Sequence, residues 1–376
     1  MKSGDFLKFL LLRDKKVILD IASDIEKIAA KIDKKIKIMH VCGTHEHTVT
    51  YYGLRSLLPD NVYVIAGPGC PVCVVPAREI DEAIELALNG VKVYTYGDMY
   101  RVPGSRKSLA DAKTEGGKVQ VVYSIGDAIK LAKTENNESV FFSVGFETTA
   151  PIPAAHINDG NIPENLTLLV SHRLTVPALK YVLDDPEISL DGVIAPGHVS
   201  AIMGASAWSF VAEDYKIPVV VAGFEPVDFM MAVDIILRLI YKGVARLVNE
   251  YSRVVNWNGN LEAKKLMNKV FKAVDGEWRG IGVLPESVLS LREKYKRYDA
   301  RERYDIEIKE VLDLPPGCKC ADVILGKAIP TDCPMFLKAC TRSRPYGPCM
   351  VSSEGTCSIW AKYGGYSIIR RKRKSL

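Results

Sequence analysis

The chain has 376 residues, of which 48% are hydrophobic and 25% are charged. This ordinary globular composition excludes wholesale disorder and collagen-like order, and the length predicts about two or three domains. Lys and Arg total 50 and Asp and Glu total 45, so the net charge is +5. Five of the positive charges form one terminal run, Arg370, Arg371, Lys372, Arg373 and Lys374. The rest of the chain is neutral, which argues against a large nucleic-acid groove, and we expect no nucleic-acid partner.

No segment matches the roughly 20 mostly apolar residues that a membrane-spanning helix needs. The apolar run Phe6–Leu12 is interrupted by Lys8 and is followed by no small-residue cleavage site, so it is not typical of a signal peptide. We therefore expect a cytoplasmic protein without a membrane partner. In that compartment the nine Cys residues are expected to be thiols, metal ligands or redox groups rather than a disulfide framework.

Helical and strand patterns alternate along most of the chain. Within the first 35 residues, Val17, Ile18, Ile21, Ile25 and Ile28 form one apolar helix face. Apolar, β-branched runs then predict strands at Ile36–Val41, Val62–Ala66, Val91–Tyr96, Val119–Tyr123, Val140–Val144, Leu166–Val170, Gly192–Ala195 and Pro218–Ala222. Helical patterns lie between them, including Ala77–Leu88, Ala128–Lys133, Pro177–Leu183 and Val227–Tyr241. Strands that are apolar on both faces and alternate with helices predict parallel sheets covered on both sides.

We interpret this order as two related, Rossmann-like α/β domains, residues 36–138 and residues 139–240. A weak internal repeat, Gly145-Phe146-Glu147-Thr148 and Gly223-Phe224-Glu225-Pro226, follows two of the strands. After about residue 245 the strands fade, and helical segments such as Leu261–Val274 follow. Six of the nine Cys residues lie between positions 318 and 357. We expect residues 1–35 and 241–376 to form a third, mainly helical and loop-rich domain.

Polar residues collect where the predicted strands end. The segments are Cys42-Gly43-Thr44-His45-Glu46, Gly67-Pro68-Gly69-Cys70-Pro71-Val72-Cys73, Gly145-Phe146-Glu147-Thr148-Thr149, Ser171-His172-Arg173 and Pro196-Gly197-His198-Val199-Ser200. In open α/β sheets, ligands bind outside the carboxyl ends of the strands, where these segments converge if the strands are parallel. Turns and helix caps explain most of the Gly, Pro, Ser and Thr residues. They do not explain three Cys residues, His45 and two Glu residues at one edge.

Cys70 and Cys73 have the C-x-x-C spacing of a redox dithiol. This spacing lets two sulfur atoms form a disulfide, and a Cys at the start of a helix has a lowered thiol pKa. Half of a zinc site has the same spacing. Because the sequence contains no obvious second C-x-x-C pair, we favour redox chemistry over zinc.

Cys42 and His45 are three residues apart, so on a first helical turn they share a face. A thiolate and an imidazole there can bind one metal or activate each other, with Glu46 and His47 as supporting groups. The alternative for a single Cys at a strand end is a small buried apolar residue. His40, inside a strand, is interpreted as a core residue. The chain lacks both G-x-G-x-x-G after its first strand and the G-x-x-x-x-G-K-[ST] motif, which argues against NAD and ATP.

The late cysteines do not follow a common metal-binding pattern. Cys318, Cys320, Cys333, Cys340, Cys349 and Cys357 are separated by one, twelve, six, eight and seven residues. Zinc knuckles, radical-type clusters and bacterial ferredoxins have other spacings. Four thiolates brought together by loops can still hold a cubane cluster, and a Pro after a Cys, as in Cys333-Pro334, is typical of cluster ligands. A structural zinc site is the alternative.

Together these motifs resemble the HypD-type [NiFe]-hydrogenase maturation factors over nearly the whole chain. The resemblance rests on the strand-end segments that start at Cys42, Gly67, Gly145, Pro196 and Gly223. It also rests on the cysteine region, which ends in Met350-Val351-Ser352-Ser353-Glu354-Gly355-Thr356-Cys357. It implies a scaffold on which a transient Fe(CN)₂CO iron is assembled, with two related α/β domains and a domain that holds a [4Fe–4S] cluster. It also implies a small HypC-type chaperone partner and a HypE-type cyanide donor that carries a thiocyanate.

The resemblance further implies roles for single residues. Cys42 binds the nascent iron with a partner thiolate, His45 is a ligand or orienting group, and Cys70 and Cys73 form the redox dithiol. From their place at a neighbouring strand end, rather than from the resemblance, Glu147, Thr148 and Thr149 are candidates for hydrogen-bonding a cyanide nitrogen or relaying protons. Helix capping is the favoured role of the two Thr residues. The resemblance assigns the [4Fe–4S] cluster to Cys320, Cys333, Cys340 and Cys357. It leaves Cys318 and Cys349 as the doubtful pair.

Two other functions account for some of these features. One is a stand-alone thiol–disulfide reductase that uses the cluster and the Cys70/Cys73 dithiol on a protein substrate, but it does not explain the Cys42-Gly-Thr-His-Glu segment. The other is a zinc-stabilised binding module whose basic tail engages RNA or an acidic partner. The neutral charge of the rest of the chain argues against the second.

Overall fold

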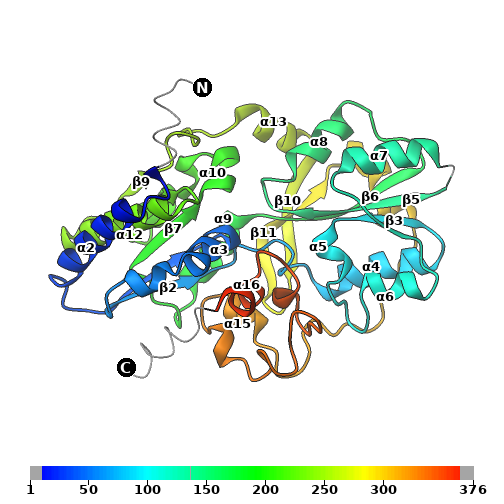
Figure 1. The fold of residues 1–376 in the computed structure, drawn as a ribbon. Helices are drawn as coiled ribbons and strands as arrows, with labels where there is room; N and C mark the ends of the chain where they lie inside the picture. Colours follow the sequence, from blue (N-terminus) through cyan, green and yellow to red (C-terminus); the bar gives the residue numbers. More distant parts are fainter. Residues whose placement is uncertain (1–10, 136, 365–376) are drawn as a thin grey trace.

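The computed structural model describes residues 11–135 and 137–364. Two β-sheets form the left and right halves of the molecule, and the cysteine-rich region lies below and between them (Figure 1). The basic run 370–374 lies outside the described residues, as does most of the apolar run Phe6–Leu12. No helix in the described part of the chain combines the length and apolar character that a membrane crossing needs.

Sheet A is wholly parallel, and its central strands are buried between helices on both faces. Helices α2, α3 and α12 contribute the core on one face, and α9, α10 and α11 contribute it on the other. Its β-branched strands suit this double burial. In spatial order the strands are β2 (Val62–Ala66), β1 (Ile36–His40), β7 (Gly192–Pro196), β8 (Val219–Ala222) and β9 (Leu247–Asn249).

Sheet B combines four parallel strands with an antiparallel hairpin at one edge. Helices α4 and α6 cover one face, and α7, α8 and α13 cover the other. In spatial order the strands are β10 (Phe271–Trp278), β11 (Gly282–Leu291), β6 (Leu166–Arg173), β5 (Ser139–Gly145), β3 (Lys92–Thr95) and β4 (Val119–Val121).

The helices connect the strands and carry the cysteine region. The α-helices are α2 (Lys15–Ala29), α3 (Gly43–Tyr51), α4 (Ala77–Leu88), α5 (Gly97–Tyr100), α6 (Leu109–Thr114), α7 (Ile125–Thr134), α8 (Pro151–Asn158), α9 (Thr175–Asp184), α10 (Gly197–Met203), α11 (Ser209–Glu213), α12 (Pro226–Tyr241), α13 (Leu261–Val270), α14 (Ala300–Arg303), α15 (Cys320–Ile324) and α16 (Thr356–Tyr363). Short 3₁₀ helices are η1 (Leu54–Leu57), η2 (Ala205–Trp208), η3 (Glu293–Tyr298), η4 (Pro330–Asp332) and η5 (Pro348–Met350).

The predicted mixed α/β class with parallel sheets is confirmed. All eight predicted strands, the helix of the first 35 residues and the four helices predicted among the strands occur close to where they were expected. The expectation that strands fade after residue 245 is wrong, because β9, β10 and β11 follow. The predicted helix Leu261–Val274 ends at Val270, and its last residues begin β10. Exposed and half-buried residues alternate along β10, as expected for an outer strand of a hairpin rather than for a helix.

The two sheets do not follow the predicted division into domains 36–138 and 139–240, because each sheet takes strands from both ranges. The chain builds β1 and β2 in sheet A, β3 to β6 in sheet B and β7 to β9 in sheet A again, and then returns to sheet B for the β10–β11 hairpin. Helix α9 makes one of these crossings, because it follows β6 and contacts β11 of sheet B while Leu179 and Val182 join the core of sheet A. A βα alternation indicates which segments are strands, but not which strands become neighbours.

The terminal segments also pack differently from the expected third domain. Helix α2 lies along α12 on sheet A rather than with the cysteine region. The late cysteines share one apolar cluster with α4, α6 and sheet B, so the cysteine region does not enclose a core of its own. Helix α16 packs on α3, which places the end of the cysteine region beside the start of sheet A's site (Figure 1).

Candidate functional site

Cys42 lies at the point where the strand order of sheet A reverses. The neighbours β1 and β7 begin connections that run in opposite directions along the sheet, and Cys42 follows β1 directly. Such a switch point leaves a crevice outside the carboxyl ends of the two strands. Cys42 is the N-cap of α3 and has an extended backbone, with φ −159° and ψ 132°. The sequence-based expectation of a site at this edge therefore agrees with where the structure places Cys42.

One small cavity brings Cys42 together with the dithiol. Its wall contains Cys42, Cys70 and Cys73 with one late cysteine, Cys349, and the carboxylate residue Glu354. The four sulfur residues come from three separate stretches of chain. The structure thus joins the strand-end motifs with the C-terminal cysteine region at one place.

Glycine residues make this close packing possible. A Cβ atom on Gly69 would overlap the backbone of Cys42, and the Gly43 N–H donates to the Gly69 carbonyl at 3.1 Å. A Cβ atom on Gly43 would lie 2.5 Å from both the Cβ and the carbonyl oxygen of Glu354. Any larger residue at these positions forces the three chain segments apart.

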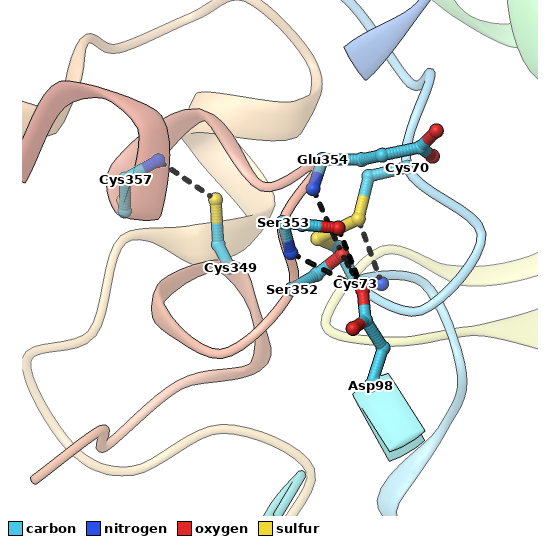
Figure 2. The surroundings of a disulfide bond; sticks show 8 residues. All are labelled: Cys70, Cys73, Asp98, Cys349, Ser352, Ser353, Glu354 and Cys357. Carbon is cyan, nitrogen blue, oxygen red and sulfur yellow. Dashed lines mark hydrogen bonds between the residues drawn. A yellow bond between two sulfur atoms is a disulfide. The ribbon is translucent and has the colours of Figure 1, made fainter. Parts of the chain in front are cut away.

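Cys70 and Cys73 form a disulfide, with Cα atoms 5.4 Å apart, and the Cys73 N–H lies 3.2 Å from the Cys70 sulfur (Figure 2). The residue spacing therefore permits the dithiol–disulfide pair that the sequence predicted. The expected helix start at Cys70 is wrong, because turns follow it and α4 begins only at Ala77, after Pro76. The Cys73 N–H, rather than a helix terminus, is the polar group beside the Cys70 sulfur.

Burial controls the acidity of the Cys42 thiol. It raises the pKa of Cys42 to about 11, and the nearby Glu354 carboxylate adds to the effect. The backbone N–H groups of His45 and Thr44 act in the opposite direction. Burial also raises the pKa of Glu354, to which the Thr44 hydroxyl donates at 3.4 Å. At neutral pH the isolated Cys42 is therefore a protonated thiol, and a cation bound there would favour its deprotonation.

The structure does not bring the His45 ring to the cavity that holds Cys42. His45 is fully buried, and its Nε2–H donates to the Gly223 carbonyl at 2.9 Å after strand β8. The ring packs on Phe224 with centroids 4.8 Å apart, and burial lowers the pKa of His45 to about 3. Because Cys42 is an extended N-cap residue, the expected shared helix face does not form. His45 instead fixes α3 against the end of β8.

Glu46 organises a buried polar network between α3 and α16. Its carboxylate accepts two hydrogen bonds from Arg55, at 2.8 and 2.6 Å, and one from the Trp360 indole at 2.7 Å. His40 Nε2 lies 2.9 Å away, and His40 itself is buried in β1, as predicted for a core residue. Burial alone would raise the pKa of Glu46, but Arg55 and His40 outweigh it and hold the pKa well below its usual range. The network fixes the helix that follows Cys42 to the helix that carries Cys357.

The loop 349–356 joins the switch points of both sheets. In sheet B the strand order reverses between β3 and β5, and Asp98 follows β3. Asp98 accepts hydrogen bonds from Ser352 and Ser353 at 2.9 to 3.4 Å (Figure 2). The adjoining Glu354 accepts from the hydroxyl of Thr44 in α3, the helix that follows β1 of sheet A. A second pocket at this edge is lined by the loop and by Tyr96, Val144, Gly145, Thr148 and Thr149.

Asp98 and Glu354 are the polar residues that sequence reasoning passed over as site residues. Asp98 had the same signal as the recognised motifs, because Gly97-Asp98 directly follows the predicted strand Val91–Tyr96. Glu354 lies in a loop remote from every strand, so no local pattern placed it beside Cys42.

Glu147 is buried below the edge of sheet B and does not line either pocket. Its Oε1 accepts from the Thr175 N–H at 2.8 Å and from the Thr175 hydroxyl at 3.1 Å. Its Oε2 is buried without a hydrogen-bond partner among the described residues. Burial consequently raises the pKa of Glu147 from 4.5 to about 7.

Glu147→Gln is expected to remove a pH-dependent loss of stability. The pKa of Glu147 is higher in the folded chain than in the unfolded chain. Its carboxyl therefore makes its full contribution to the free energy of unfolding below pH 4.5, and this contribution is lost as pH rises to about 7. The full change corresponds to roughly 3 kcal/mol. Urea unfolding between pH 4.5 and 8 should show the wild type losing stability relative to the variant. Glu213→Gln, at an exposed position, should run parallel to wild type; a parallel Glu147→Gln curve would contradict the prediction.

The six late cysteines gather around one region of the structure. Five of them line a common cavity with Met335, Phe336 and Met350, namely Cys318, Cys320, Cys333, Cys340 and Cys357. A Cβ atom on Gly347 would lie 2.5 Å from the Cys320 sulfur and 2.9 Å from the Cys318 sulfur. The Cys357 N–H lies 3.2 Å from the Cys349 sulfur. Cys349 therefore adjoins this cavity as well as the one that holds Cys42.

The donor set of this region fits a thiolate-bound metal group. Contacts with the Cys320 and Cys357 thiols lower the pKa of Cys349, and contacts with Cys320 and Cys349 raise that of Cys357. In the described residues, no three or more Cys, His, Asp or Glu side chains already converge as a metal site. Clustered thiols with few oxygen or nitrogen donors are nevertheless the chemistry of iron–sulfur ligation. Both of the doubtful cysteines, Cys318 and Cys349, lie in this cluster with the four predicted ligands.

Comparison with known proteins covers nearly the whole chain. The family model HypD, described as the hydrogenase formation hypA family, matches residues 16–364. A hydrogenase expression/formation protein of Methanocaldococcus jannaschii is 48% identical over 94% of this chain and 98% of its own length. Hydrogenase maturation factors HypD of Azotobacter vinelandii and Escherichia coli are 42% and 40% identical, over 90% and 88% of this chain and 92% and 90% of their own lengths. The chain therefore belongs to the HypD family of hydrogenase maturation factors.

Proposed function

We propose that this maturation factor assembles an Fe(CN)₂CO group on Cys42, together with a HypC-type chaperone and a HypE-type cyanide donor. The observation that carries the proposal is the single cavity lined by Cys42, Cys70, Cys73 and Cys349. It sets a candidate iron ligand beside a two-electron dithiol and beside a cysteine of the late cluster. Low-spin iron with cyanide and CO favours soft thiolate ligands, which this cavity supplies and an oxygen-lined pocket would not.

The dithiol matches the electron count of cyanide release. Breaking the sulfur–carbon bond of a thiocyanate yields a thiolate and cyanide and takes up two electrons. Oxidation of the Cys70 and Cys73 thiols to their disulfide supplies those two electrons. Restoring the dithiol takes two electrons, and a [4Fe–4S] cluster held by the late cysteines would supply one-electron redox chemistry for this purpose.

We assign the cluster to Cys320, Cys333, Cys340 and Cys357, the four ligands that the family resemblance implies. These four line one cavity, and Cys349 connects that cavity with the Cys70–Cys73 region through its contacts with Cys320 and Cys357. Electrons therefore have a short route between the two places. The chain itself supplies thiols and an apolar wall that includes Met335, Phe336 and Met350.

Glu354 and Asp98 are the polar residues best placed to serve the iron site. Glu354 lines the cavity of Cys42 and raises the thiol pKa, so it is the nearest carboxylate able to accept the thiol proton when iron binds. Asp98 holds the loop that carries Glu354. We assign His45 an orienting role for α3 rather than a ligand role, and Glu147 a supporting role below the edge of sheet B.

A stand-alone reductase of protein disulfides agrees less well with the structure. Cys73 is completely buried and Cys70 is 6% exposed, so a protein substrate cannot reach either sulfur without movement of the surrounding loops. That function also leaves Cys42 without a role.

Anaerobic purification of the full chain tests the proposal. We expect brown protein that contains iron and acid-labile sulfide. In complex with its two partners, we expect infrared bands from bound CN and CO. Colourless protein that contains zinc, or a complex without those bands, would overturn the assignment.

A further inference from the structure

Arg279 is a buried cation without a full set of partners. It lies in the turn between β10 and β11 and is 1% exposed. Its backbone N–H donates to Val74, next to Cys73, and its Nε donates to the Asp313 carbonyl at 2.8 Å. Its Nη1 and Nη2 atoms are buried without hydrogen-bond partners among the described residues. An unpaired buried guanidinium is costly, so its retention at this place calls for an anion nearby.

Two other buried arginines, Arg55 and Arg173, do have carboxylate partners for their terminal nitrogens. Arg55 makes two hydrogen bonds to the Glu46 carboxylate, and Arg173 makes two to Glu79. Each therefore has a carboxylate that neutralises its charge within the fold. The two terminal nitrogens of Arg279 have no such pairing.

The groups around Arg279 that can carry negative charge are two carboxylates and two late cysteines, whose thiols become thiolates when they bind a metal group. Burial lowers the pKa of Arg279, and Asp313, Cys320, Cys318 and Asp81 oppose the effect. The Asp313 carboxylate already accepts from the backbone N–H groups of Ala77 and Gly280, and the Asp81 carboxylate accepts from Ser105. Asp313 makes the largest of these contributions, but among the described residues neither carboxylate accepts a hydrogen bond from the terminal nitrogens of Arg279. A Cβ atom on the adjacent Gly280 would lie 3.1 Å from the Cβ atom of Ala321, which follows Cys320. The remaining groups for the guanidinium to face are therefore the sulfur atoms of Cys318 and Cys320.

We infer that Arg279 is the buried counter-cation of the thiolate-bound cluster and sets its reduction potential. The inference rests on the cluster in the proposed function. A thiolate-bound iron–sulfur cluster is anionic, and each electron it accepts adds one negative charge. A fixed buried cation therefore stabilises the reduced form more than the oxidised form and raises the potential. The hydrogen bond from the Arg279 backbone to Val74 fixes the turn that carries this side chain to the segment that follows the Cys70–Cys73 disulfide.

The test is a redox titration of cluster-loaded full-length protein, poised with dithionite and followed by electron paramagnetic resonance. For Arg279→Met we expect at least a tenfold fall in the equilibrium constant of one-electron reduction, a shift of about 59 mV to more negative potential. Arg279→Lys, which keeps the charge, should recover most of the shift. Arg344→Gln removes an exposed arginine of the cysteine region and should leave the potential unchanged. An unchanged midpoint in Arg279→Met would overturn the inference.

Thermal unfolding without and with the cluster gives a second readout. In cluster-free protein, Arg279→Met removes an unbalanced buried charge, so its melting temperature should equal or exceed that of wild type. After loading, the variant should melt below wild type, because the cluster has lost its counter-cation. Equal destabilisation in both forms would indicate a purely structural role and contradict the inference. Wild-type protein that holds no iron or sulfide would instead overturn the cluster assignment itself.

Discussion

Replacing Cys42 with alanine is expected to abolish iron–cyanide assembly while leaving the fold and the late-cysteine cluster intact. Cys42 lines the cavity shared with the disulfide, but it is not among the residues that line the cavity of the predicted cluster ligands. Its loss removes one sulfur atom from a small space, so the chain should still fold. The infrared bands of CN and CO in the partner complex should disappear, whereas iron and sulfide per chain should stay at the wild-type level.

A matched variant separates the thiol from the shape of the cavity. Ile324 lines the same cavity without offering a ligand atom, so Ile324→Val changes the packing and not the chemistry. We expect this variant to keep the infrared bands, with a loss of about 1 kcal/mol in unfolding free energy. If Cys42→Ala assembled the Fe(CN)₂CO group as well as wild type, the metal role of Cys42 would be wrong. If both variants lost the bands, the cavity shape rather than the thiol would be responsible.

Arg55→Met is expected to lower the free energy of unfolding by about 3–5 kcal/mol at pH 7, because it leaves the buried Glu46 carboxylate without its cation. The paired Glu46 has a depressed pKa, so its stabilising contribution is fully present well above pH 4.5. It begins to fall near pH 4.5 and is lost progressively as pH approaches the much lower pKa of the folded chain. The difference between variant and wild type should therefore shrink in acid. Urea unfolding at pH 7 and pH 4 measures both effects.

Two further variants test whether the buried pair causes this loss. The double variant Glu46→Gln/Arg55→Met should recover part of the stability, because the stranded charge is gone. Lys27→Ala removes an exposed partner of Asp24 and should change the unfolding free energy by about 1 kcal/mol or less. A loss of under about 1 kcal/mol in Arg55→Met would show that the network between α3 and α16 does not hold the site together.

Local sequence patterns were sufficient to predict most helices and strands, but not the backbone geometry at Cys42 and Cys70. Strands β1 to β8 were predictable because double burial favours apolar, β-branched runs. The β10–β11 hairpin was missed because its exposed outer strand mixes charged and apolar residues, as a solvent-facing helix also does. At Cys42 and Cys70 the expected helical geometry failed. The first is an extended N-cap, and the second precedes a series of turns.

The sequence alone determined the α/β class, the polar residues at the strand ends, the two groups of cysteines and the family that these motifs resemble. Only the tertiary structure decided that β1 joins β7, that the loop 349–356 reaches both sheets, and that Cys349 and Glu354 lie beside Cys42 and the dithiol. The reason is physical. Helix and strand periodicity depends on residues a few positions apart, whereas these contacts join segments up to about 300 residues apart, whose pairing is selected by packing and hydrogen bonding across the whole fold.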